Sequence, residues 1–311
     1  MAKKRKGVSS DEDDDWFEPV KSARTAKKRV AVKIKRKRAA SGDESAEPDD
    51  EYEAQTSDAV QTRRHPISMH TLSEVKPLRA ALLGWYAGVH ASRGMPWRKP
   101  YEHTSNPEER SQRAYEVWIS EIMLQQTQVA TVIPYYNKWM AKFPTIRDLA
   151  ASDIETVNSL WKGLGYYSRA ARLLSGAQKV IQQLGGRLPD NAKDLESKIP
   201  GIGRYSAGAI CSIAYNQCVP VLDGNVHRLL SRVLALYAPP KAKQTLDILW
   251  AGASAFVDRA ERPGDLNQAL IELGSTVCKV RDPDCDACPL RPWCAGHHYE
   301  SYTKQLGDIY R

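Results

Sequence analysis

The sequence predicts an all-α fold, and three observations support that prediction. After residue 71, apolar residues recur at helical spacing along most of the chain. Glycine and proline interrupt many of these runs where helices should end. Strand-like alternation is scarce, because residues 218–222 are the one β-rich stretch and it is short. The helical runs have no fixed period, so we do not expect a solenoid.

Composition narrows the class of protein. The 311-residue chain is 42% apolar and has a formal net charge of +8. This length is sufficient for one or two domains, and the basicity favours a polyanionic partner without requiring one. No apolar run approaches the roughly 20 residues of a membrane span, and no signal-peptide core follows the charged start. We therefore expect a soluble intracellular protein without a membrane partner.

Residues 1–70 differ in composition from the rest. The first 64 residues contain 16 Lys or Arg and 14 Asp or Glu, with no helical period, so we expect a disordered tail. Basic clusters at residues 3–6 and 27–38 are typical of nuclear-import signals or nonspecific nucleic-acid arms, and a merely solvated tail is the alternative. Acidic blocks at 11–15 and 43–53 count against a pure DNA arm. We favour the nucleus as the location, with a mitochondrial pool as the second.

The ordered region is expected over residues 71–277. Leu78, Leu82 and Tyr86 lie at helical spacing after Pro77, which suits a first helical turn. Gly94 is expected to close this helix, and residues 99–112 are expected to form a long polar loop. Further amphipathic runs span residues 114–126, 128–142, 153–161, 166–184, 204–216, 225–237, 242–259 and 264–278.

Glu121 is an anomaly in the run 114–126, which is apolar nearly all round. Its neighbours by helical angle are Trp118, Val117 and Leu124. A carboxyl group in such surroundings loses hydration, which raises its pKa and prepares it to act as a general acid. Pairing with a buried arginine is an equally good interpretation of the position alone.

A second unusual stretch surrounds Pro200, which ends one helix, and Gly201 and Gly203, which permit a tight reversal with positive φ. The next helix begins at about Tyr205, so backbone N–H groups at its start could bind a phosphate. An ordinary helix–turn–helix with a glycine hinge is the alternative. Asp223 lies eighteen residues after Tyr205, and a helix of about 12 residues would bring its carboxylate back near the reversal. An Asp in such a turn more often caps a helix.

Four of the six cysteines lie within residues 278–294. They are Cys278, Cys285, Cys288 and Cys294. In a reducing compartment this crowding indicates a metal centre rather than disulfides, and a four-cysteine zinc site is the generic alternative. The other two cysteines are most simply core thiols.

Several motifs together resemble the MutY-type adenine DNA glycosylases of the helix–hairpin–helix, iron–sulfur DNA glycosylase superfamily. The similarity spans residues 72–295 in order. The motifs that carry it are Met95-Pro96-Trp97-Arg98, residues 118–129 around Glu121, residues 160–167, the reversal at 199–208, Leu222-Asp223-Gly224-Asn225-Val226 and Asn267-Gln268-Ala269-Leu270. The resemblance implies two helical subdomains and a [4Fe–4S] cluster held by the four cysteines. It also implies a monomer that removes adenine mispaired with 8-oxoguanine, or with guanine, in double-stranded DNA.

The resemblance also implies roles for single residues. Glu121 would protonate N7 of the extruded adenine, and Asp223 would stay ionised and stabilise the oxocarbenium-like sugar. Tyr205 and Asn225 match positions that support these carboxylates. The implied DNA-binding residues are Trp97, Arg98 and Gln268 in the adenine pocket, Gln126 and Tyr166 as wedges, and Gly201 and Gly203 in the hairpin.

Two departures qualify the resemblance. Tyr205 stands where endonuclease III-like enzymes have a Schiff-base lysine, so we expect a monofunctional glycosylase. A bifunctional endonuclease III-like glycosylase/lyase and a non-catalytic iron–sulfur DNA-binding module are the alternatives. After a tail at residues 295–311 the chain ends, where MutY-type enzymes continue into a Nudix-like domain that helps to read 8-oxoguanine. We expect this chain to lack that domain, and a fragment, a truncated product and a divergent enzyme all fit this ending.

Overall fold

The computed structural model describes residues 66–72 and 74–299, and these residues contain helices and loops but no β-strand. The helices are η3 (Ile67–His70), α1 (Val75–Val89), α2 (Pro107–Leu124), α3 (Val129–Lys142), α4 (Ile146–Ala150), α5 (Ile154–Trp161), α6 (Ser168–Gln183), α7 (Ala192–Lys198), α8 (Arg204–Tyr215), α9 (Gly224–Val233), α10 (Lys243–Val257), α11 (Pro263–Thr276) and η4 (Arg291–Trp293). This confirms the all-α prediction. The two basic clusters of the predicted tail lie outside the described residues, and residues 295–299 are helical.

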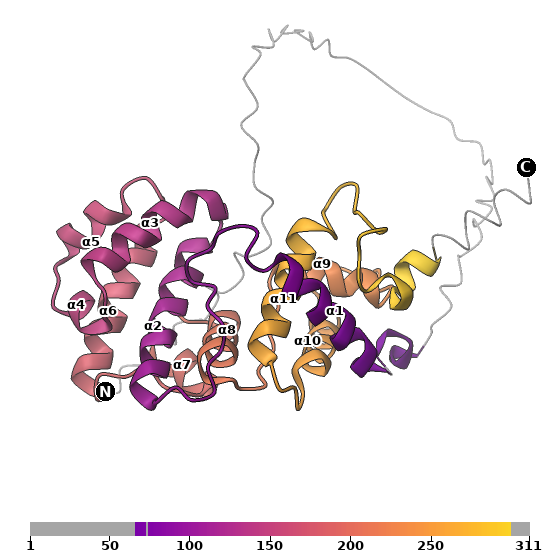
Figure 1. Cartoon of the computed structure of the whole chain (residues 1–311), viewed down its shortest axis with the longest axis horizontal. Helices are drawn as coiled ribbons and strands as arrows, with labels where there is room; N and C mark the ends of the chain where they lie inside the picture. The colour runs from indigo at the N-terminus through magenta and orange to yellow at the C-terminus, as the bar shows by residue number, and fades with distance from the viewer. Residues whose placement is uncertain (1–65, 73, 300–311) are drawn as a thin grey trace, which may run out of the picture. The chain divides into compact units, whose positions relative to one another are not determined.

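The helices form two groups that meet at α8 and α11. In the first group α2 packs on α8 and α3, α6 packs on α4 and α5, and α7 packs on α8. In the second group α11 contacts α1, α9 and α10, so the first long helix joins the last three (Figure 1). Contacts between α8 and α11 connect the two groups. Residues at this junction come from distant parts of the sequence, which is how a site can be assembled there.

Two glycines let α11 approach its neighbours closely. A Cβ at Gly264 would lie 2.6 Å from the carbonyl oxygen of Ser212 on α8. A Cβ at Gly274 would lie 2.7 Å from the carbonyl oxygen of Asn225 on α9. Both distances are shorter than van der Waals contact, so larger residues would push α11 away from α8 and α9.

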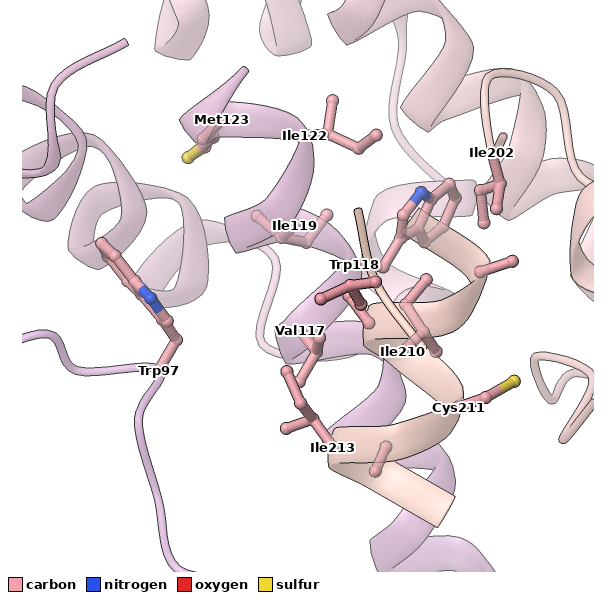
Figure 2. Packing of buried hydrophobic residues seen from close by; sticks show 14 of the residues in the cluster. Trp97, Val117, Trp118, Ile119, Ile122, Met123, Ile202, Ile210, Cys211 and Ile213 are labelled. Carbon is pink, nitrogen blue, oxygen red and sulfur yellow. The ribbon is translucent and has the colours of Figure 1, made fainter. Parts of the chain in front are cut away.

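The core is centred on α2, which is buried on all sides in its second half. Trp118, Ile119 and Ile122 pack with Ile210 of α8 and with Ile202 of the preceding turn (Figure 2). This confirms that Glu121 lies in an apolar helix.

Three expectations about local structure were wrong. Gly94 does not close the first helix, because α1 ends at Val89 and residues 90–93 form a turn. Residues 107–112 are helical, because Asn106 and Glu109 form a capping box with reciprocal hydrogen bonds of 2.9 Å and Pro107 occupies the first turn. Gly203 does not have a positive φ; its φ is −96°, and it is the N-cap of α8. The reversal depends on Gly201, whose φ is +78°.

Candidate active site

A cavity of about 240 Å³ lies between the two groups of helices. By the same measure a water molecule needs roughly 10–15 Å³, so the cavity can admit a ring system. It brings together seven of the predicted site residues. They are Trp97, Arg98, Glu121, Tyr205, Asp223, Asn225 and Gln268.

Glu121 projects from α2 into this cavity and is 8% exposed. Its Oε2 accepts a hydrogen bond of 2.9 Å from the hydroxyl of Tyr205 on α8. Burial raises the pKa of Glu121 to about 7; the Tyr205 hydrogen bond opposes this rise and the negative charge of Asp223 adds to it. Arg98, whose charge lowers this pKa, forms its ion pair with Glu272 instead. The group can therefore hold a proton at neutral pH.

Asp223 performs a structural task at the same time. Its Oδ1 accepts the Val226 N–H at 2.8 Å and caps α9, and its Oδ2 accepts the Asn225 amide at 2.8 Å. Burial raises the pKa of this carboxyl above its usual value, and both hydrogen bonds limit the rise. Unlike Glu121, it therefore receives two donors that favour its ionised form.

Trp97, Arg98 and Gln268 form another part of the wall. Trp97 is buried and its ring lies edge-on to Tyr136, with the ring centroids 5.1 Å apart. The side-chain amide of Gln268 donates to the Gly264 carbonyl oxygen at 3.2 Å. An indole face and an amide held by the backbone are suited to stacking against a planar base and hydrogen bonding to its edge.

The sequence did not identify Arg93 or Glu272. Arg93 lines the cavity, and its Nη1 lies 3.2 Å from Oε2 of Glu272 on α11. An arginine in a turn and a glutamate in an amphipathic helix give no local signal, since 179 residues separate them.

A larger depression of about 670 Å³ adjoins the cavity, and Gln125 and Tyr205 line both. It contains the remaining predicted DNA-binding residues, Gln126, Tyr166, Gly201 and Gly203. Gln126 has φ +52° and Tyr166 has φ +48°, in the left-handed region that non-glycine residues rarely adopt. Such strain often marks a functional site, and here it coincides with the two predicted wedges.

Arg169 connects the backbone next to Gln126, at the end of α2, with the loop that contains Tyr166. Its Nη1 donates to the carbonyl oxygens of Ile122 at 2.8 Å and Gln125 at 2.7 Å, while Nη2 donates to those of Leu164 and Gly165, both at 3.3 Å. The buried guanidinium thus satisfies carbonyls at the end of α2 and in the loop before α6. It fixes the backbone on which both wedge candidates sit.

The four clustered cysteines lie on the loop after α11, against α9. Burial, with the charges of the three other cysteines adding to its effect, raises the pKa of Cys288 to about 11. Arg232 contacts both ends of the loop, through Nη1 to Cys278 Sγ at 3.3 Å and through its carbonyl oxygen to Cys294 Sγ at 3.6 Å. Among the described residues no three Cys, His, Asp or Glu are grouped so as to hold a metal ion. Four thiols on one loop are nevertheless the donor set of an iron–sulfur centre, and ligation would require them to converge.

A further arginine connects this loop with the cavity. Arg228 of α9 donates from Nη2 to Asn225 Oδ1 at 3.0 Å and from Nε to the Cys278 carbonyl oxygen at 2.9 Å. Because Asn225 in turn donates to Asp223, a chain of hydrogen bonds runs from the cysteine loop to a cavity carboxylate.

The chain is similar in sequence to known DNA repair proteins. Residues 119–254 match the family model of the HhH-GPD superfamily base excision DNA repair proteins. The adenine DNA glycosylase of Rattus norvegicus is 45% identical over 280 residues, which are 89% of this chain and 53% of the relative. The Homo sapiens enzyme of the same name is 51% identical over 223 residues, which are 72% of this chain and 40% of the relative. The chain thus spans about half the length of these relatives or less.

Solved structures share the fold. A thermostable thymine-DNA glycosylase superposes with a TM-score of 0.59 at 24% identity and covers 72% of this chain and 96% of its own. Endonuclease III in a trapped covalent complex with DNA gives a TM-score of 0.54 at 18% identity, and the match covers 74% of this chain and 100% of the endonuclease III chain. No helix in the described part of the chain is long and apolar enough to cross a membrane. The superfamily match and the identity to adenine DNA glycosylases support the resemblance of this chain to the MutY-type adenine DNA glycosylases, and the solved structures show that it shares the fold of DNA glycosylases.

Proposed function

We propose that this protein removes adenine from mispairs with 8-oxoguanine or guanine in double-stranded DNA. The observation that carries the proposal is the pair of carboxylates in one cavity, with Glu121 able to hold a proton at neutral pH and Asp223 held by two donors. Opposed protonation states are what an acid-assisted glycosidic cleavage needs. Trp97 and Gln268 supply a flat apolar wall and an amide for the flipped base.

In the proposed reaction the carboxylic acid of Glu121 gives its proton to N7 of adenine. The bond between N9 and C1′ then breaks, and its electron pair leaves with the base. The carboxylate of Asp223 stabilises the positive charge that develops on the sugar. Water adds to C1′ and its proton passes to the Glu121 carboxylate, which restores the acid and leaves an abasic site. Tyr205 donates to Glu121, and its pKa is raised well above the usual value by burial and by the two carboxylates, so it remains a hydroxyl donor.

We further propose that Cys278, Cys285, Cys288 and Cys294 hold a [4Fe–4S] cluster. The cluster would act as a structural centre that fixes the loop against α9, with no open coordination position for substrate. The residues between the cysteines, including Lys279 and Arg281, would then face phosphates. The nucleus is the proposed location, with the protein acting as a monomer.

The decisive test compares base release from duplexes with adenine opposite 8-oxoguanine, adenine opposite guanine, thymine glycol and undamaged DNA. We expect release of adenine from the first two. Glu121→Gln should bind the mispaired duplex as the wild type does and lose nearly all excision, because an amide is not a proton donor of suitable acidity. Near-normal single-turnover cleavage by this variant would remove Glu121 from the mechanism.

Strand scission separates this proposal from the lyase alternative. Tyr205 follows the hairpin Gly-x-Gly-Arg, so an amine for Schiff-base chemistry is not supplied at that place. We expect an intact abasic strand until alkali is added. Efficient borohydride trapping, together with strand cleavage before alkali, would instead support a bifunctional enzyme. Release of no base from any duplex, with binding retained, would support the non-catalytic module.

A further inference from the structure

Glu272 is a buried carboxylate without a part in the mechanism above. It lies on α11 with its side chain 2% exposed, and two arginines donate to it. Arg98 Nη2 lies 2.6 Å from its Oε2, and Arg93 Nη1 lies 3.2 Å from the same oxygen. Both arginines line the cavity that contains Glu121, so Glu272 holds two cations of the site from α11.

Arg98 depends on this carboxylate for its position. Its side chain is 8% exposed, and its guanidinium lies over the Tyr86 ring at 5.5 Å. Its Nη1 also donates to the His90 carbonyl oxygen at 3.3 Å. A buried guanidinium is costly without an anionic partner, and Glu272 is the carboxylate that meets it here.

The charge of Arg98 acts on the general acid. Glu121 is influenced by Tyr205 from α8, by Asp223 at the start of α9 and by Arg98 from the loop before α2. The first of these donates a hydrogen bond, the second adds negative charge and the third adds positive charge. Positive charge favours the ionised carboxylate, which cannot donate a proton. Two arginines and one glutamate leave a net charge of +1 in this cluster, and without Glu272 it would be +2.

We propose that Glu272 is a positioning residue for base excision, which fixes Arg98 in the cavity wall and offsets its charge so that Glu121 keeps its proton. The inference rests on the proposed function, since it assigns Glu272 a role toward the same general acid. It also explains why a carboxylate is buried on α11 behind two arginines.

The test compares Glu272→Gln with a matched control, Glu116→Gln. Glu116 is a carboxylate of α2 that also bridges two cations, Lys99 at 2.6 Å and Arg113 at 3.4 Å, but does so away from the catalytic cavity. Single-turnover excision is measured from pH 5 to 9, and the wild-type rate should fall above the pKa of Glu121, which is about 7. Glu272→Gln should be about 10-fold slower at pH 7.5, with its falling limb about one pH unit lower. Glu116→Gln should keep the wild-type profile.

A second variant works in the opposite direction. Arg93→Gln removes one cation from a side chain that is 33% exposed, so folding is little affected, and the falling limb should move to higher pH. If Glu272→Gln does not fold, the pH profile of Arg93→Gln alone tests the inference. An active Glu272→Gln whose limb stays in place, or an Arg93→Gln profile that does not move, would overturn the inference. A wild-type protein that releases no adenine would contradict the proposed function itself, which is a different outcome.

Discussion

At the scale of single residues, Glu121 makes the free energy of unfolding depend on pH. Its pKa is about 7 in the folded protein, whereas an exposed glutamate titrates near 4.3. Between these values the folded state binds more protons than the unfolded state, so stability falls as pH rises through that window. The burial that prepares the carboxyl to donate a proton therefore destabilises the fold at neutral and alkaline pH.

We expect Glu121→Gln to be more stable than the wild type at pH 8, by on the order of 2–3 kcal/mol. The difference should shrink as pH falls and disappear near pH 4, where both side chains are neutral. Calorimetric unfolding of the two proteins across this range measures it. A wild-type protein that is as stable as the variant at pH 8 would show that Glu121 is not held in its raised-pKa state.

How far the sequence could predict the site depends on the residue. A lone carboxylate in an apolar helix is visible as a local anomaly, so Glu121 could be found, and the glycine turn around Asp223 could be found in the same way. Arg93 and Glu272 could not, because their significance arises from an ion pair between residues far apart in the chain. The sequence also could not decide whether Glu121 is a protonated general acid or the ion-pair partner of a buried arginine. The answer depends on which carboxylate forms the ion pair with Arg98, and in the structure it is Glu272.

At the scale of elements, the start of α2 shows why periodicity alone misplaced a helix end. Residues 107–113 are polar, so they give no apolar repeat, and the signal lies in the cap. Asn106 accepts the Glu109 N–H, and the Glu109 side chain accepts the Asn106 N–H. α4 and α7 begin with similar caps at Thr145 and Asn191. The apolar pattern did not predict these two helices, because they are too short to show a helical repeat.

Asn106→Ala should therefore destabilise the protein by about 1 kcal/mol, because an orphan N–H of α2 loses its acceptor. Thr104→Ala, an exposed change two residues earlier, is the control and should be neutral. Urea unfolding of both variants measures the difference. Equal midpoints would mean that the capping box contributes nothing to α2.

The cysteine loop is the other element with a direct test. Purified protein should be brown and contain about four irons per chain, and Cys288→Ser should impair folding more than chemistry. Cys218 was expected to be a core thiol, but it is exposed and lies outside the loop, so the Cys218→Ser protein should keep its iron. Metal analysis of anaerobically prepared protein is the measurement. Stoichiometric zinc without iron would contradict the cluster assignment.

At the scale of the whole described molecule, the proposed reaction would divide between two spaces, with base extrusion at the larger depression and bond cleavage in the cavity. Tyr166 lines the larger depression and is 61% exposed, whereas Glu121 is buried in the cavity. Gln125 and Tyr205 line both spaces. Sequence periodicity could supply the helices but not this arrangement. It depends on α1 packing with α10 and α11, and no local pattern encodes those contacts.

Tyr166→Ala should slow single-turnover excision by about tenfold or more, because one stacking contact contributes about 1–3 kcal/mol to holding a gap open. The pH at which the rate falls should not change, since Glu121 lies in the other space. Tyr167→Ala removes an exposed neighbouring ring and serves as the control. A displaced pH profile in Tyr166→Ala would mean that extrusion and proton donation are not separate.

The double duty of Asp223 has a consequence for the fate of variants in a cell. Because its Oδ1 caps α9, Asp223→Ala removes a proposed catalytic charge and loosens a helix in one step. Asparagine is an equally good cap, so Asp223→Asn should lose the charge while keeping the helix. Two inactive alleles at one codon would then differ in abundance: the alanine form would be cleared by quality control, and the asparagine form would accumulate on mispaired DNA and block access to it.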